Sequence, residues 1–215
     1  RGMTVPVFHG SRRAEKHAQQ LLERQIAINQ LTLALANASD TDHVYHTLYQ
    51  HVAQLIDAEA FIISFYDRAN QLIRAGYIVN QESILNPSDF PPIPLEKEGQ
   101  GTQSRVIRTG EPLYVADYRA AMETTTTEYT IDDAGAVTQG SPPTKAKGQA
   151  TQSALYAPMK IAGEIIGLIQ VQSHRPDAYT ESDLLLLSSL ANVAAIAIQT
   201  ARLLDFLRRP NDALA

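Results

Sequence analysis

The 215-residue chain has a formal net charge of −5 and a hydrophobic content of 44%, which supplies enough apolar side chains for the core of one domain with extensions. This mildly acidic balance offers no basic surface for nucleic acid or for an anionic membrane. Because the chain contains no Cys, disulfides, thiolate catalysis and Cys-ligated zinc are excluded.

The first part of the chain predicts two helices. Residues 1–13 are expected to be irregular, whereas residues 14–38 are strong helix formers without Gly or Pro. Three apolar residues recur every seven positions in that segment, which favours a coiled-coil signalling helix: Leu21, Ile28 and Leu35. A second helix is predicted from the N-cap residue Ser39 or Asp40 to about Ile56.

The middle of the chain predicts short strands around one short helix. Aromatic and β-branched residues indicate the strands, and a following Gly ends the helix. In chain order, these elements are the strands at 61–66 and 72–79, the helix at 102–109 and the strand at 113–115. Residues 116–152 form a long polar segment, and a loop of this length is typically functional or disordered. We expect it to be either a lid or a passive insertion.

Two strands and a long helix complete the predicted pattern. The strands lie at 153–160 and 164–173, on either side of a tight turn. The helix begins after Thr180, where Asp183 completes a start similar to a capping box, and it continues to about residue 209. A compact domain does not need a helix of this length, so residues 205–215 are interpreted as its extension towards a further domain.

Apolar residues occupy most of the circumference of this last helix. Contact with a sheet needs only one apolar stripe, so a partner has to cover a second surface. We therefore expect a homodimer in which both terminal helices form a bundle about a two-fold axis. The predicted dimer interface consists of Leu21, Ile28, Leu35, Leu190, Ala194, Ala197, Ala201 and Leu204.

Three stretches of the sequence resemble the GAF domain family. They are residues 98–117, residues 153–159 with the sequence SALYAPM, and residues 165–183, which begin with IIGL and end with YTESD. The resemblance implies a GAF domain at 39–204 with an α+β fold, in which an antiparallel sheet carries helices on one face and a ligand pocket on the other. It also implies a module of a bacterial signalling protein, such as a sensor histidine kinase of a two-component system or a diguanylate cyclase, whose output domain is absent from this chain.

Known ligand classes of the family lose their anchoring residues here. Members that attach a bilin, and those that reduce methionine sulfoxide, use a Cys, which this chain lacks. Members that bind cyclic nucleotides carry an Asn-Lys pair after the last strand, followed by Phe and Asp-Glu. The corresponding residues here are Gln172-Ser173, Tyr179 and Asp183-Leu184. The resemblance therefore implies a non-catalytic sensor and leaves its cofactor unknown.

Polar and apolar side chains mix on the predicted pocket face. In the strand at 164–173, Gln170 and Gln172 share a side with Leu168, although buried amides need hydrogen-bond partners. We expect the ligand-binding residues to be Ser64, Tyr66, Tyr114, Asp117, Tyr129, Tyr156, Gln170 and Gln172. The alternative is a half-solvated face beneath a loop, in a dimerisation scaffold without a physiological ligand.

The sequence shows no catalytic or metal-binding pattern. His43, His46 and His51 share a predicted helix, but His51 lies far round that helix from His46, so we interpret them as surface residues. The longest apolar run, 184–198, is interrupted by polar residues and is shorter than a membrane span, and no signal-peptide pattern is present. We expect a cytoplasmic protein whose partners are a small molecule, a second copy and an output domain.

Overall fold

The computed structural model describes residues 9–38, 40–124, 129–131, 137–139 and 151–208. The helices are α1 (His9–Ala36), α2 (Thr41–Leu55), the 3₁₀ turn η1 (Pro87–Asp89), α3 (Thr102–Thr109), α4 (Tyr118–Thr124) and α5 (Glu181–Arg208). The strands are β1 (Ala60–Asp67), β2 (Leu72–Asn80), β3 (Ser83–Leu85), β4 (Ile93–Pro94), β5 (Leu113–Val115), β6 (Tyr129–Ile131), β7 (Val137–Gln139), β8 (Ser153–Ile161) and β9 (Glu164–Ser173).

One seven-stranded antiparallel sheet organises the domain. Its strand order is β3-β2-β1-β9-β8-β5, and β4 pairs with β2 outside this path. The short strands β6 and β7 form a separate pair. Because the first seven residues of β8 are all buried, β8 is covered on both faces of the sheet.

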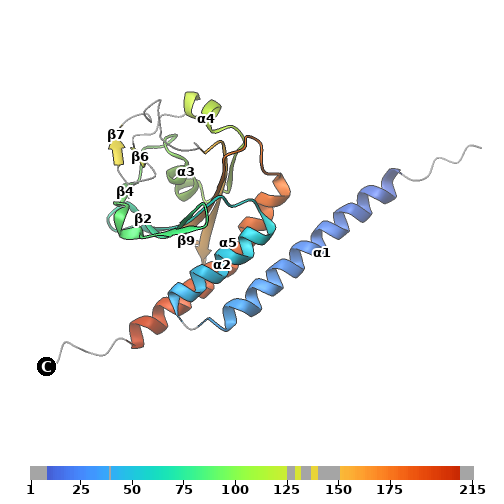
Figure 1. The fold of residues 1–215 in the computed structure, drawn as a ribbon, viewed down its shortest axis with the longest axis horizontal. Coiled ribbons are helices and arrows are strands. Elements are labelled where there is room, and N and C mark those ends of the chain that lie inside the picture. The colour runs from blue at the N-terminus through green and yellow to red at the C-terminus, as the bar shows by residue number, and fades with distance from the viewer. Residues whose placement is uncertain (1–8, 39, 125–128, 132–136, 140–150, 209–215) are drawn as a thin grey trace, which may run out of the picture.

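The three longest helices lie on one face of this sheet (Figure 1). α2 and α5 pack on the strands, and α1 packs along α2 and α5. The short helices α3 and α4 lie over the opposite face, where their residues join a second core cluster. The predicted α+β fold, an antiparallel sheet with its long helices on one face, is therefore confirmed.

The main core fills the layer between the sheet and α2 and α5. Phe61 of β1, Leu155 of β8 and Ile169 of β9 are fully buried there. α5 contributes Leu187, Leu190, Ala191, Ala194, Ala195, Ile198 and Ala201. These residues recur at helical spacing, so one stripe of α5 faces the sheet.

Local sequence signals explain where these elements begin and end. Asp40 caps α2 by accepting a hydrogen bond from the His43 amide at 2.8 Å. At α5, the Asp183 carboxylate accepts from the Thr180 amide at 2.8 Å while the Thr180 hydroxyl accepts from the Asp183 amide at 3.2 Å, which is the predicted capping box. α3 ends at Gly110, which adopts the left-handed conformation, and its bounds match the prediction.

Some elements depart from the sequence-based expectation. α1 begins at His9, earlier than residue 14, and η1 and β4 lie within 87–94, where no element was predicted. Within the predicted lid at 116–152, the structure contains α4, β6 and β7. Elements of two to seven residues carry too few periodic positions to be recognised from sequence.

By length and composition alone, α5 is long and apolar enough to cross a membrane. The polar residues that interrupt the apolar run at 184–198 therefore do not exclude a membrane span on grounds of composition. Its buried stripe packs against β8 and the rest of the main core, however, so its apolar character matches that of a core helix.

Candidate ligand-binding face

Strand pairing brings several of the predicted ligand residues to one face of the sheet, which we call the α3 face. Tyr156 of β8 pairs with Gln170 of β9, and Gln170 pairs with Ile62 of β1. Residues paired across antiparallel strands share a face, so Tyr156 and Gln170 lie side by side. Ser64 lies one pair further along, opposite Leu168, and Tyr66 packs against the same cluster.

Apolar side chains from both layers fill the space over this face. Tyr156 and Leu168 of the sheet pack against α3, and Tyr118 and Ala121 of α4 pack at the margin. The buried members of this second core cluster are Ile73, Val106, Ile107, Val115, Ala154, Tyr156 and Leu168. The described part of this face is therefore packed with side chains.

The Tyr156 hydroxyl joins three elements. It lies 2.9 Å from the Tyr118 hydroxyl, at the start of α4, and hydrogen bonds to Thr102, the first residue of α3. Burial raises the pKa of Tyr156 well above its ordinary value, with the neighbouring Tyr118 adding to the shift. Tyr156 is therefore a neutral anchor whose hydroxyl already has partners, which limits its availability to a ligand.

Two side-chain carbonyls on the opposing layers lack such partners. The Oε1 atoms of Gln170 and Gln103 are buried without a hydrogen-bond partner in the described part of the chain. Gln170 as a whole is only 3% exposed. Sequence analysis missed Gln103, although it precedes Val106 and Ile107 by three and four residues and so shares their side of α3.

The N-terminus of α3 is occupied by a side chain of the protein itself. The buried Glu96 carboxylate lies so close to Gly101 that a Cβ there would overlap its Oε2. The Ser104 hydroxyl accepts from the Glu96 amide at 3.0 Å, and Arg108 donates to the Glu96 carbonyl from Nε at 2.9 Å. Glu96 thus supplies the negative charge that a helix N-terminus favours.

Several predicted ligand residues have other roles. Tyr114 lies on the opposite face, since it pairs with Leu155 of the main core, and its hydroxyl donates to Asp177 at 2.7 Å. Burial and Asp177 raise the pKa of Tyr114 to about 12. The Asp117 carboxylate accepts from the Ala120 amide at 3.1 Å at the start of α4, and Gln172 Oε1 accepts from Thr151 at 2.6 Å. Tyr129 belongs to β6, and its side chain lies outside the described residues.

The predicted dimer interface needs a correction. Leu35, Leu190, Ala194 and Ala201 are buried within the chain's own core, so they offer no surface to a partner. Ile28 and Ala197 are partly buried against the same core, whereas Leu21 and Leu204 are exposed. Ile28 and Leu35 of α1 pack into the core that α2 and α5 share, and this stripe of α5 packs on the sheet, so neither set is free to contact a second copy.

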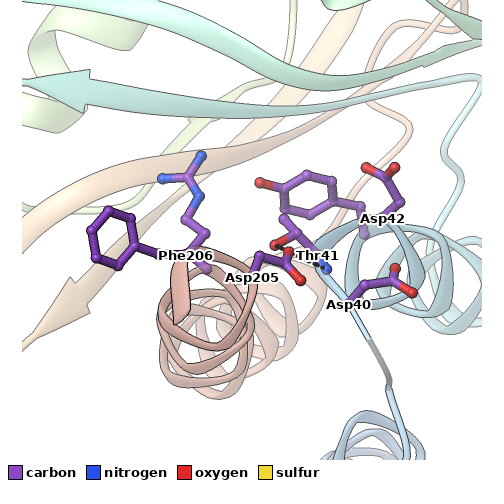
Figure 2. A pocket seen from close by; sticks show the side chains of 7 residues that line it. Asp40, Thr41, Asp42, Asp205 and Phe206 are labelled. Atoms are coloured by element: carbon purple, nitrogen blue, oxygen red, sulfur yellow. Dashed lines mark hydrogen bonds between the residues drawn. The ribbon is translucent and has the colours of Figure 1, made fainter. Parts of the chain in front are cut away.

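A hollow of about 510 Å³ opens where the end of α5 meets the start of α2 (Figure 2). Asp205 of α5 lies beside Thr41 of α2 and accepts hydrogen bonds from its hydroxyl at 2.6 Å and its amide at 3.1 Å. The Arg202 guanidinium carbon lies 3.5 Å from the centroid of the Phe65 ring, and Arg202 also hydrogen bonds to Tyr45. These contacts fasten the end of α5 to α2 and β1. The hollow is lined by Asp40, Thr41, Asp42, Tyr45, Arg202, Asp205 and Phe206.

Solved structures share this fold at low sequence identity. The chain is similar to the GAF domain from a phosphoenolpyruvate-protein phosphotransferase of Coxiella burnetii, with 16% identity, coverage of 86% of this chain and 98% of that chain, and a TM-score of 0.64. The corresponding domain from Acinetobacter has 14% identity, coverage of 86% and 98%, and a TM-score of 0.63. A free methionine-R-sulfoxide reductase from Neisseria meningitidis, solved with its substrate, has 16% identity, coverage of 84% and 91%, and a TM-score of 0.59.

Sequence comparison assigns the family. A comparison with curated proteins found no match. The family model described as GAF domain matches residues 38–199, which include the whole seven-stranded sheet, α2, α3, α4 and most of α5. The chain therefore belongs to the GAF domain family.

Proposed function

We propose that this GAF domain is a non-catalytic sensor that binds a small molecule between the α3 face of the sheet and helices α3 and α4. The observation that carries this proposal is Gln170, whose buried Oε1 has no partner in the described part of the chain. Leaving a buried carbonyl without a hydrogen bond costs about 1–3 kcal/mol, so such a group calls for a partner. A bound molecule would supply it.

Strand alternation connects ligand binding on the α3 face to the packing of α5 on the other side of the sheet. Gln170 alternates along β9 with Ile169 and Val171, whose side chains belong to the main core that α5 completes. A ligand that shifts β8 and β9 therefore changes the surface on which α5 rests. To act as a signal, the ligand must bind the protein more tightly when α5 is in one arrangement than when it is in the other.

The site chemistry favours binding over catalysis. The described α3 face contains apolar, hydroxyl and amide side chains, and the chain has no Cys nucleophile. In the larger protein, α5 would pass the ligand state to an output domain in the manner of a cytoplasmic bacterial signalling protein. Two-component sensors and diguanylate cyclases are the classes we consider.

Native mass spectrometry of the protein purified from its host cells tests the proposal. We expect a mass above that of the polypeptide, because a small molecule stays bound. Removal of this molecule should increase hydrogen exchange in β8, β9 and α5. The matched control is β3, which contacts β2 at the far edge of the sheet and should exchange at the same rate in both forms. A uniformly empty protein that no metabolite mixture stabilises would contradict the proposal.

A second candidate function is a dimerisation scaffold with a filled pocket. Its support is the close packing of the α3 face, together with apolar residues that remain exposed on the long helices. On α1 these are Leu21, Leu22, Ile26 and Leu33, and on α5 they are Leu185, Ile196, Leu203, Leu204, Phe206 and Leu207. Under this alternative, the purified protein is empty and still dimeric.

A further inference from the structure

Two amide carbonyls without a hydrogen-bond partner in the described part of the chain lie on two elements that pack on each other, β9 and α3. Gln170 is on β9 beside Tyr156, and Gln103 is on the side of α3 that carries Val106 and Ile107 into the second core cluster. α3 packs against both β8 and β9, and Thr102, the residue before Gln103, bonds to the Tyr156 hydroxyl. The two carbonyls therefore come from elements that pack on each other across this layer.

The described residues of the second core cluster carry no charge of their own. The buried residues of the second core cluster are apolar apart from the Tyr156 hydroxyl, which burial keeps protonated. The nearest buried carboxylate described, Glu96, is committed to the N-terminus of α3 at Gly101. Burying an ion without an opposite charge is far more costly than burying a neutral polar group that gains a hydrogen bond.

We propose that the molecule bound at the α3 face is uncharged and bears N–H donors, as amides, ureas and lactams do, and that it hydrogen bonds to Gln170 and Gln103. This inference rests on the proposed sensor function and adds the chemical class of the ligand. Carboxylates, phosphates and amines are excluded by the same reasoning, since the described site offers them no counter-charge.

The first test uses the protein without added ligand. Gln170→Leu removes the unpartnered carbonyl, so it should raise Tm by roughly 2–4 °C. Gln172→Leu is the matched control, two residues along the same strand and on the same face. Because the Gln172 carbonyl already bonds to Thr151, its loss should lower Tm. If Gln170→Leu also lowers Tm, the Gln170 carbonyl has a partner and the proposal is overturned.

The second test compares probes of similar size and shape: neutral amides, which carry N–H donors, and the corresponding carboxylates, which are charged and carry none. Benzamide and nicotinamide should raise the Tm of the wild-type protein more than benzoate and nicotinate, and Gln170→Leu should abolish that difference. Equal or greater stabilisation by the carboxylates would overturn the proposal, as would a charged molecule found by native mass spectrometry. In those two cases the sensor function stands and only the ligand class is wrong. An empty protein that no probe stabilises would instead refute the sensor function, and this inference with it.

Discussion

Tyr156 shows how one side chain can set the shape of the α3 face. Its ring lies in the second core cluster, and its hydroxyl bonds to Tyr118 of α4 and Thr102 of α3. Both partners are the first residues of their helices, so this hydroxyl ties the starts of α3 and α4 to the sheet. Any ligand at this face has to be accommodated around that anchor.

Replacing Tyr156 by Phe should reduce the free energy of unfolding by about 1–3 kcal/mol at pH 7, because two half-buried hydroxyl partners lose their bond. Burial raises the pKa of Tyr156 above the value of about 10 expected in the unfolded chain. Above pH 10 the unfolded state therefore releases a proton that the folded state keeps, and wild-type stability falls as pH rises.

Urea denaturation at neutral pH and at about pH 10.5 measures both effects. The Tyr156→Phe protein should be less stable at neutral pH and should lose less stability on going to alkaline pH. Tyr118→Phe, which removes only one of the two bonds, should have the smaller effect at neutral pH. An alkaline loss in Tyr156→Phe equal to that of the wild type would show that this phenol does not contribute.

Individual site residues differ in how far the sequence could locate them. Gln170 and Tyr156 lie in strands of nine or more residues, where alternation indicates the face reliably. Tyr114 lies in the three-residue strand β5, which is too short to reveal a face, and it was assigned to the wrong one. Asp117 accepts a local bond from the Ala120 amide at the start of α4, whereas Gln172 bonds to Thr151, which only the folded chain brings close.

At the scale of elements, α5 shows why a sequence can define a helix without orienting it. Its start was predictable from Thr180 and Asp183, and its apolar content indicated a core element. Apolar residues surround most of the helix, however, so the sequence did not distinguish the stripe that faces the sheet from the stripe that faces outwards. Leu190 was placed at a dimer interface although it is fully buried against the sheet.

Alanine substitutions at one buried and one exposed position of α5 should differ in their effect on stability. Leu190→Ala should reduce the free energy of unfolding by about 2–5 kcal/mol, because it leaves a cavity in the main core. Ile196→Ala is the control, since this residue is 64% exposed and its loss should change stability by about 0.5 kcal/mol or less. Chemical denaturation monitored by circular dichroism measures both, and similar losses would mean that the packing of α5 is different from that described.

At the scale of the whole molecule, the long helices retain apolar side chains that the chain itself does not cover. Ile196, Leu203 and Leu207 follow one side of α5 at helical spacing, and Leu22, Ile26 and Leu33 do so on α1. These residues now replace the buried ones as the basis of the proposed homodimer. Leu21 and Leu204, from the original interface prediction, are also exposed and stay compatible with it.

A double substitution tests this revised interface. Ile196→Glu combined with Leu203→Glu should convert a dimer into monomers in analytical ultracentrifugation, because charged groups do not tolerate burial between apolar helices. Ile84→Glu is the control, an equally exposed apolar position on β3 that should leave the mass unchanged. A dimer that survives the double substitution would place the interface elsewhere.

The contacts at the end of α5 bear on where this domain can be cut. The family match stops at residue 199, yet Arg202 stacks on Phe65 of β1 and Asp205 bonds to Thr41 of α2. A fragment trimmed to the matched residues would retain every strand and still lose these two tethers. The physical domain therefore extends at least to Asp205, and in a longer protein any stretch or rotation applied beyond that point would act directly on the first strand of the sheet and on α2.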